Sequence, residues 1–203
     1  MTYGKVFIVD DDEPIRDALS WLLQSRGVDA VAFASAEQFL AQWTPDMAGC
    51  LLLDIRMSGM SGLDLFDRLR EVQSRIPVIF LTGHGDVPMA VGALKKGARD
   101  FVEKPFNDNE LVDRVIEALE WDARRRADEA DTATLAARLA QLTLRERQVM
   151  ELVLAGKLNK VIADELGITM RTVEVHRAHV FEKMGVKTAV ELAQLLSSYK
   201  GER

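Results

Sequence analysis

The first 121 residues alternate between short apolar runs and longer amphipathic segments, and this alternation restricts the fold more than any other feature. The expected strands are Lys5–Val9, Val28–Phe33, Cys50–Leu53, Val78–Leu81 and Phe101–Val102. The expected helices are Glu13–Ser25, Ala36–Trp43, Leu63–Gln73, Val87–Lys96 and Asp108–Trp121. Strands that alternate with helices pair in parallel through right-handed crossovers. The pattern therefore predicts an α/β fold, a five-stranded doubly wound parallel sheet with helices on both faces.

The composition changes after residue 121. Residues 122–131 are rich in alanine and charge and have no apolar stripe, which favours a solvated helical linker over residues 122–141. Leu135, Leu139 and Leu142 recur at helical spacing, so they either pair with a partner helix or pack on the next domain. We expect three parts: a domain over 1–121, the linker, and a second domain over 142–203.

Residues 142–203 have only helical patterns. Thr143 and Glu146 form one expected capping box, and Thr188 and Glu191 form another. Between them lie a short helix, Lys160–Leu166, and a longer one from Thr169 to Met184, separated by Gly167. A short helix, a glycine turn and a longer helix are typical of a helix-turn-helix. The second domain is therefore expected to be an all-α, four-helix helix-turn-helix domain.

The net charge of −6 is distributed unevenly. It is −8 over residues 1–121, zero over 122–141 and +2 over 142–203, so only the last part suits a polyanion. The one cysteine, Cys50, lies in an apolar run; it excludes an intramolecular disulfide and is expected in the core. No apolar run reaches the ~20 residues of a membrane helix, and no secretion signal is visible. We expect a cytoplasmic protein without a membrane partner.

Polar side chains follow four of the five expected strands. These residues are Asp10, Asp11, Asp12, Asp54, Thr82 and Lys104. Singly, they could serve as a helix cap, a turn residue or a surface cation. The carboxyl ends of parallel strands, however, share the edge at which doubly wound sheets bind ligands. Their coincidence at that edge therefore predicts a site.

The residue types at this edge suit phosphoryl chemistry. Clustered carboxylates repel one another, and a hard cation such as Mg²⁺, which takes carboxylate and phosphate oxygens, relieves that repulsion. An aspartate can act as a nucleophile and form an acyl phosphate. A lysine and a metal then stabilise the charge on the phosphoryl oxygens.

Four segments resemble the signature of response-regulator receiver domains, which have a flavodoxin-like fold. They are VDDD at 9–12, LDIRMSGMSG at 53–62, LTGHGD at 81–86 and FVEKPF at 101–106, and the resemblance covers roughly residues 4–121. It implies that Asp54 is the phosphoacceptor. It also implies Mg²⁺ as cofactor, held by Asp10, Asp11, Asp54 and the backbone carbonyl of Arg56.

The same resemblance gives roles to three further residues. Lys104 would pair with the phosphoryl group, Thr82 would be the switch hydroxyl, and Phe101 the aromatic residue that rotates with it. The Lys104–Pro105 bond is expected to be cis, which only an X–Pro bond adopts cheaply. One position departs from the pattern: Ser58 stands where most relatives have proline.

The helix expected after Thr169 has polar residues on its outer face, as a recognition helix needs. Glu174 could accept a hydrogen bond from cytosine, and Val175 could contact a thymine methyl group. The ordinary alternative is a solvated amphipathic helix. His176 and His179 have no further ligand at metal-binding spacing, so no metal is expected there.

The segment LTLRERQVMELVLAGKLNKVIADELGITMRTVEVHRAHVFEKMGVKTAVEL closely resembles the LuxR-type DNA-binding domain. Together with GHGDVPMAV at 83–91, it makes the whole chain similar to response regulators of the FixJ/NarL type, in particular the FixJ branch. This implies transcriptional activation and dimerisation on phosphorylation. The implied partners are a sensor histidine kinase, promoter DNA and RNA polymerase. The implied DNA contacts are Lys160, Thr172, Glu174, Val175, Arg177, Ala178 and Lys183.

In the expected mechanism, phosphorylation draws Thr82 and Lys104 inward and changes the surface of the fourth helix and fifth strand. Val87, Met89, Val91 and Leu94 are the apolar candidates for that surface. Two other functions compete with this non-enzymatic switch. One is a metal-dependent phosphatase of the haloacid dehalogenase kind, which would turn over a phosphate ester. The other is a DNA-binding protein whose first domain only dimerises, which would bind DNA without regard to a phosphodonor.

Overall fold

The computed structural model describes residues 4–83 and 87–200. The chain divides into two compact units, Met1–Arg126 and Ala127–Arg203. The division into three parts, with boundaries at 121 and 141, stays a prediction. Among the described residues, no helix combines the length and the apolar character needed to cross a membrane.

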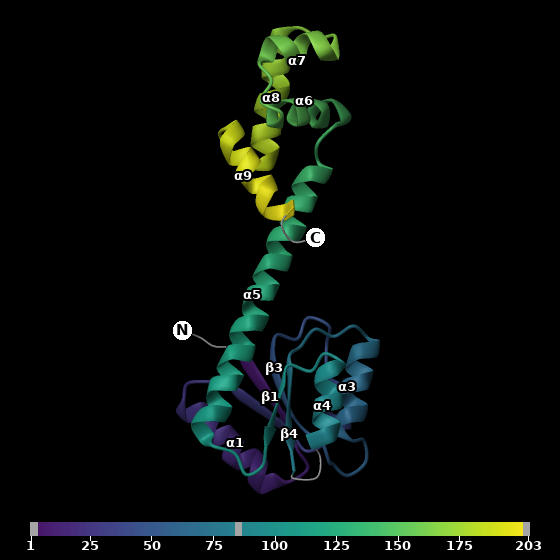
Figure 1. The fold of residues 1–203 in the computed structure, drawn as a ribbon, viewed down its shortest axis with the longest axis vertical. Coiled ribbons are helices and arrows are strands. Elements are labelled where there is room, and N and C mark those ends of the chain that lie inside the picture. The colour runs from purple at the N-terminus through teal and green to yellow at the C-terminus, as the bar shows by residue number, and fades with distance from the viewer. Residues whose placement is uncertain (1–3, 84–86, 201–203) are drawn as a thin grey trace. The chain divides into compact units, whose positions relative to one another are not determined.

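The first unit is built on the expected parallel sheet (Figure 1). Its strands are β1 (Lys5–Val9), β2 (Ala30–Phe33), β3 (Gly49–Asp54), β4 (Val78–Thr82) and β5 (Asp100–Glu103). They lie in the order β2-β1-β3-β4-β5, and each neighbouring pair is parallel. β3 and β4 are buried along their whole length, which is why their sequences are continuous apolar runs.

Helices cover both faces of this sheet. They are α1 (Glu13–Ser25), α2 (Ala36–Gln42), α3 (Gly62–Glu71), α4 (Val87–Lys95) and α5 (Asp108–Ala140). Figure 1 shows α1 on one side of the sheet and α3 and α4 on the other. One core joins α1 and the first part of α5 to the sheet, through residues such as Leu23 and Val115. A second core joins α2, α3 and α4 to the opposite face, through Phe39, Leu65 and Ala93.

The ends of these elements follow the local signals in the sequence. Ser61 begins α3 with a complete capping box, in which Asp64 is the partner, and Asn107 accepts hydrogen bonds from the first amides of α5. Gly27 and Gly97 follow α1 and α4 with positive φ angles. β2 begins two residues later than expected, because the amide of the buried Val28 bonds to Leu23 O at the end of α1.

The start of the expected linker is not solvated. Asp122 is only 2% exposed. Its Oδ2 accepts a hydrogen bond from Gly49 N at 3.0 Å and from Arg126 Nε at 2.8 Å. Arg125 also binds the Asp122 carboxylate, and Arg126 reaches the carbonyls of residues 46 and 47. Asp122, Arg125 and Arg126 therefore attach α5 to the first unit, and the solvated interpretation was wrong for these three residues, whereas Ala123 and Arg124 are exposed as expected.

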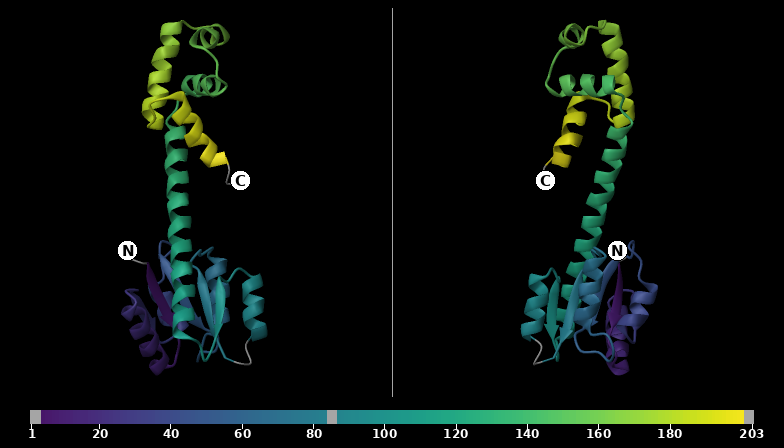
Figure 2. Two further views of the ribbon diagram at one scale, coloured as in Figure 1. Left: turned by 60° about the vertical axis from the view of Figure 1, so that its left-hand side comes forward. Right: turned by 90° about the vertical axis from the view of Figure 1, so that its right-hand side faces the viewer.

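The second unit contains the end of α5 and four further helices. These are α6 (Leu144–Leu154), α7 (Asn159–Leu166), α8 (Met170–Met184) and α9 (Ala189–Lys200). In both views of Figure 2, α6 and α7 (green) lie against α8 (yellow-green). Leu135 and Leu142 are buried in the core of this unit and Leu139 packs against it, so the leucines pack within the chain.

The helix-turn-helix has the expected local geometry. α7 ends at Gly167 and α8 ends at Gly185, both in the left-handed conformation. Thr169 begins α8, and its hydroxyl accepts from Thr172 N. Val173, Val180 and Met184 of α8 are buried, so the opposite side of the helix faces away from the core.

Candidate functional site

The acid that follows β1 and the acid that ends β3 both contact the lysine that follows β5. Lys104 Nζ lies 2.8 Å from Asp10 Oδ2 and 2.6 Å from Asp54 Oδ1. Asp10 is 1% exposed and Asp54 7%. One ammonium group thus joins two buried carboxylates, and three of the predicted site residues form a single cluster.

The register of the parallel strands brings these side chains together. Val9 lies opposite Leu53, so Asp10 and Asp54 each follow at the next position. Thr82 lies opposite Glu103, and the amide of Lys104 donates to Thr82 O at 2.8 Å. The four strand ends therefore place the polar residues side by side, as the pattern of apolar strands predicted.

Burial and charge pairing act in opposite directions on the groups of this cluster. Burial raises the pKa of Asp54, although its hydrogen bond with Lys104 opposes the change. For Lys104, burial alone lowers the pKa, but the hydrogen bonds to Asp10 and Asp54 outweigh it and the pKa is raised. Lys104 therefore stays charged, and Asp54 lacks the solvation that an ordinary surface carboxylate has.

The expected switch residues lie beside this cluster. Thr82 is fully buried, and its hydroxyl donates to the carbonyl of Gly83 at 3.1 Å. Phe101 is partly buried against the core that contains α3 and α4. The Lys104–Pro105 bond is cis, as expected. Thr82 and Phe101 thus occupy neighbouring strands, β4 and β5.

Asp11 is oriented differently from Asp10 and Asp54. Its Oδ2 accepts hydrogen bonds from Ser58 N and Ser58 Oγ, each at 2.8 Å. The Ser58 amide and hydroxyl lower the pKa of Asp11. On the same loop, Arg56 N donates to Asp54 Oδ2 at 2.8 Å. The loop between β3 and α3 is thus bonded to both Asp54 and Asp11.

In the arrangement that the structure shows, the acidic side chains provide only part of a binding site for a hard cation. Asp10 and Asp54 offer close, buried carboxylate oxygens, the ligands that Mg²⁺ prefers. Within the described residues, however, no three acidic, histidine or cysteine side chains are gathered as a metal-binding group. Oδ2 of Asp11 is bonded to Ser58, and Asp11 is not part of such a group.

The outer surface of α4 is partly apolar. Met89 and Val91 are exposed, whereas Ala90 and Ala93 are buried and Leu94 packs against the core. Of the four candidates for the switching surface, Met89 and Val91 therefore face outward and Leu94 packs inward. The side chain of Val87 and residues 84–86 of the LTGHGD segment lie outside the described part.

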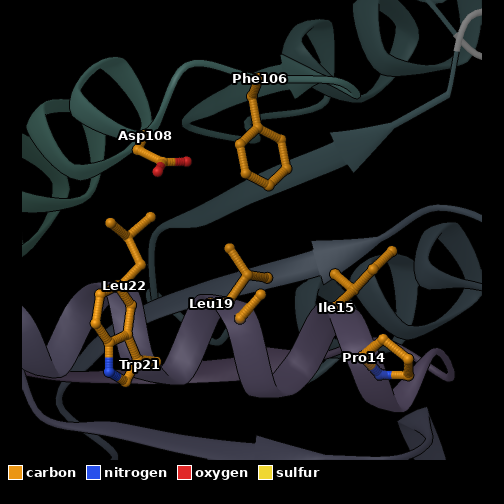
Figure 3. Close-up of a pocket in the computed structure, with 8 residues that line it drawn as sticks. Pro14, Ile15, Leu19, Trp21, Leu22, Phe106 and Asp108 are labelled. Atoms are coloured by element: carbon orange, nitrogen blue, oxygen red, sulfur yellow. The ribbon is translucent and has the colours of Figure 1, made fainter.

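An open apolar groove of about 410 Å³ lies between α1 and the segment that enters α5. Figure 3 shows Ile15, Leu19 and Leu22 of α1 on one side and Phe106 on the other. The indole of Trp21 is largely exposed at this groove. Phe106, two residues after Lys104 in the sequence, adds apolar surface to this groove. Such surface suits contact with a protein partner.

The expected DNA-contacting residues fall into an exposed group and a partly buried group. Lys160 of α7 and Glu174, Val175 and Ala178 of α8 are exposed, as a reading surface requires. Thr172 is half-buried, and its hydroxyl bonds to that of Thr169 at 2.8 Å. The first group is accessible without any rearrangement.

Arg177 and Lys183 form bonds inside the second unit. Arg177 binds Asn159 Oδ1 at 2.6 Å and lies over the ring of Phe181. Lys183 Nζ lies 2.7 Å from Oε2 of the buried Glu146, and this ion pair together with the cap bonds of Thr143 lowers the pKa of Glu146 to about 2. The sequence indicated Glu146 as a capping residue, but gave no sign of its pairing with Lys183.

His179 lies near the same acid. Its Nδ1 is 3.6 Å from Glu146 Oε1, and among the described residues no metal-binding group includes His179.

Each half of the chain matches a known family model. Residues 6–116 match the family model described as "Response regulator receiver domain". Residues 140–196 match the model described as "Bacterial regulatory proteins, luxR family". Together these matches cover most of the chain.

Several characterised proteins are similar over nearly their whole length. The C4-dicarboxylate transport transcriptional regulatory protein DctR of Rhodobacter capsulatus is 50% identical over 94% of this chain and 98% of its own. The transcriptional regulatory protein FixJ of Rhizobium meliloti is 46% identical over 96% of each chain. The solved structure of the response regulator StyR is 41% identical, with a TM-score of 0.90 over 97% of this chain and 100% of that one. The chain therefore belongs to the family of transcriptional response regulators that join a receiver domain to a LuxR-type DNA-binding domain.

Proposed function

We propose that Asp54 accepts a phosphoryl group from a sensor histidine kinase and that this controls dimerisation and promoter binding. One observation supports it above all: Lys104 joins Asp54 to Asp10 in a buried cluster at the carboxyl ends of β1, β3 and β5. A nucleophilic carboxylate beside a fixed cation is the arrangement that acyl-phosphate formation needs. Because the proposed target is promoter DNA, the protein would act in the cytoplasm.

Each residue of the cluster has a distinct task in this proposal. A carboxylate oxygen of Asp54 attacks phosphorus while the P–N bond to the kinase's phosphohistidine breaks and the imidazole leaves, so that an acyl phosphate forms. Lys104 balances the added charge of about −1.5 to −2. Asp10, Asp11, Asp54 and the carbonyl of Arg56 are the proposed ligands of Mg²⁺, which when bound stabilises charge on the transferring phosphoryl oxygens. The hydroxyl of Thr82 turns from Gly83 O to the phosphoryl group, and Phe101 follows it.

The output of the switch is proposed to pass through the surface of α4 and β5. Met89 and Val91 already expose apolar area there, which a second copy of the chain can cover in a dimer. Moving a population from 1:99 to 99:1 requires about 5.5 kcal/mol. A charge-assisted contact in a partly dry pocket together with a dimer interface is of that order. Promoter activation through RNA polymerase is the proposed result.

On the DNA side, we propose that the exposed face of α8 enters the major groove. Glu174 and Val175 are the proposed base-reading residues, with Ala178 close to the groove, while Lys160 and Thr172 contact phosphates. Arg177 and Lys183 can contribute only by exchanging or sharing their bonds to Asn159 and Glu146.

Labelling with radioactive acetyl phosphate tests the phosphoacceptor. The wild-type chain is expected to take up one acid-stable, base-labile label per molecule, and Asp54→Asn none. The matched control is Asp12→Asn, since Asp12 caps α1 at the same edge and asparagine is an equally good cap. Label in Asp54→Asn equal to that of the control would refute the assignment, and continued release of phosphate over many turnovers would favour a phosphatase.

Promoter binding tests the switch. Genomic fragments selected by the wild-type chain are expected to bind more tightly after phosphodonor treatment, with no change for Asp54→Asn. Equal binding with and without donor would instead support a first unit that only dimerises. Analytical ultracentrifugation of the same samples measures the dimer directly.

A further inference from the structure

The position four residues after Asp54 carries two hydrogen-bond donors in this chain. Both the amide and the hydroxyl of Ser58 donate to Oδ2 of Asp11, each at 2.8 Å. Proline, the residue that the receiver pattern favours here, has neither an N–H nor a hydroxyl. The contact between Ser58 and Asp11 is therefore a property of this sequence rather than of the pattern.

The two bonds hold Asp11 apart from the other acids. Asp10 and Asp54 both contact Lys104, whereas the Asp11 carboxylate contacts Ser58. In the portion of the chain that the structure describes, Asp11 forms no metal-binding group with Asp10 and Asp54. Both bonds fall on Oδ2, so turning Oδ2 toward a cation would lose or weaken them.

We propose that Ser58 is a positioning residue that restrains Asp11, so that a divalent cation must compete with Ser58 for this ligand. The inference rests on the metal site of the proposed function. It adds that metal affinity is set partly by a side chain that does not itself bind the metal. It also couples the cation to the loop that carries Ser58.

The loop between β3 and α3 is held on either side of Ser58 by hydrogen bonds from its backbone amides, so an effect of Asp11 on Ser58 would be confined to the middle of the loop. Arg56 N donates to Asp54 Oδ2 at 2.8 Å, and Met60 N donates to Glu37 Oε1 at 3.1 Å. Ser58 lies between these two points and is fastened only through Asp11 among the bonds seen in the described residues. When Asp11 leaves, the middle of the loop is released while its two sides stay attached.

Binding of Mn²⁺ to the full-length chain, measured by electron paramagnetic resonance without any phosphodonor, tests the proposal. Ser58→Ala keeps the amide but removes the hydroxyl, and its dissociation constant for Mn²⁺ is expected to fall about three- to tenfold, the effect of one hydrogen bond to an exposed carboxylate. Ser58→Thr retains both donors and is expected to match the wild type. In the wild type, the Ser58 amide resonance is expected to shift when Mg²⁺ is added.

Each other outcome has a definite meaning. Unchanged or weaker binding by Ser58→Ala overturns the restraint, because the hydroxyl then does not compete with the metal. Asp11→Asn is expected to weaken Mn²⁺ binding, and wild-type affinity in that variant also overturns the inference. If the wild-type chain binds no Mn²⁺, the metal site of the proposed function fails, and the inference fails with it.

Discussion

The carboxylate of Asp122, near the middle of the long helix α5, accepts a hydrogen bond from the backbone amide of Gly49 at the first residue of β3. The distance between Asp122 Oδ2 and Gly49 N is 3.0 Å, and both residues are buried. Arg125 and Arg126 bind the same carboxylate, so its charge is compensated. The sheet and α5 are thus joined by a polar contact at the end of β3 opposite to Asp54.

Asp122→Ala is expected to lower the free energy of unfolding of the first unit by about 2–4 kcal/mol. The change leaves a buried amide and the partners of a buried carboxylate unsatisfied. Urea denaturation measures the loss, and hydrogen exchange at the Gly49 amide locates it. Asp128→Ala, an exposed position on the same helix, is the control and should change stability by less than about 0.5 kcal/mol. Equal effects of the two substitutions would contradict the role of the buried contact.

Gly62→Ala is expected to impair the proposed phosphoacceptor site. A Cβ atom at Gly62 would lie 2.0 Å from the carbonyl oxygen of Asp54, so the backbone that carries the proposed nucleophile must move. We expect slower labelling by acetyl phosphate and a loss of about 1–3 kcal/mol of stability. Gly92→Ala in α4, where no atom lies within 4 Å of the added Cβ, is the control. It should label normally and be more stable by up to about 1 kcal/mol.

The ion pair of Glu146 and Lys183 predicts a pH dependence for the second unit. The hydrogen bond from Lys183, together with the cap bonds of Thr143, lowers the pKa of Glu146 from its ordinary value of 4.5 to about 2. A lowered acid pKa adds stability above the unfolded pKa, and that stability is lost as the pH falls from 4.5 toward 2. Glu146→Gln should lower the free energy of unfolding by about 1–3 kcal/mol at pH 7. The difference from wild type should shrink in acid; a constant difference across this range would contradict the assignment.

Two lysines of the DNA-binding unit are expected to behave differently. Lys160→Ala removes an exposed cation, so DNA affinity should fall equally for all sequences and the salt slope should decrease by about one. Lys183→Ala removes the partner of the buried Glu146, so it should also lower the thermal stability of the free protein. Titrations at several salt concentrations and calorimetry separate these effects. A Lys160→Ala variant with an unchanged slope would remove Lys160 from the phosphate contacts.

The sequence predicted those features that depend on periodicity and on the ends of elements. Continuous apolar runs identified the buried strands β1, β3 and β4, and in a parallel sheet the residues after them must share an edge. The same reasoning, applied to the residue after β5, predicts that Asp10, Asp54 and Lys104 lie together, and the three are in contact. The helix-turn-helix followed similarly from a short and a longer helical pattern separated by Gly167.

Side-chain pairings between distant segments could not be predicted in this way. The charged sequence around Asp122 resembles a solvated helix, because nothing in it reveals a buried amide 73 residues away. The bonds from Ser58 to Asp11 depend on the conformation of a loop, and only the absence of proline marked that position. Arg177 and Lys183 were expected to be available to DNA, and their bonds to Asn159 and Glu146 depend on how α6, α7 and α8 pack.

Because Lys104 is shared between Asp10 and Asp54, it attracts an incoming anion less strongly than an unpaired lysine would. The ammonium group of Lys104 already contacts both Asp10 and Asp54. An anion that enters the site would therefore replace these ion pairs in part rather than meet an unpaired cation. A phosphoryl group on Asp54 would therefore gain less attraction from Lys104 than an unpaired lysine would give it. Its loss by hydrolysis would let Lys104 return to the two carboxylates, so the same three residues can serve both states of the proposed switch.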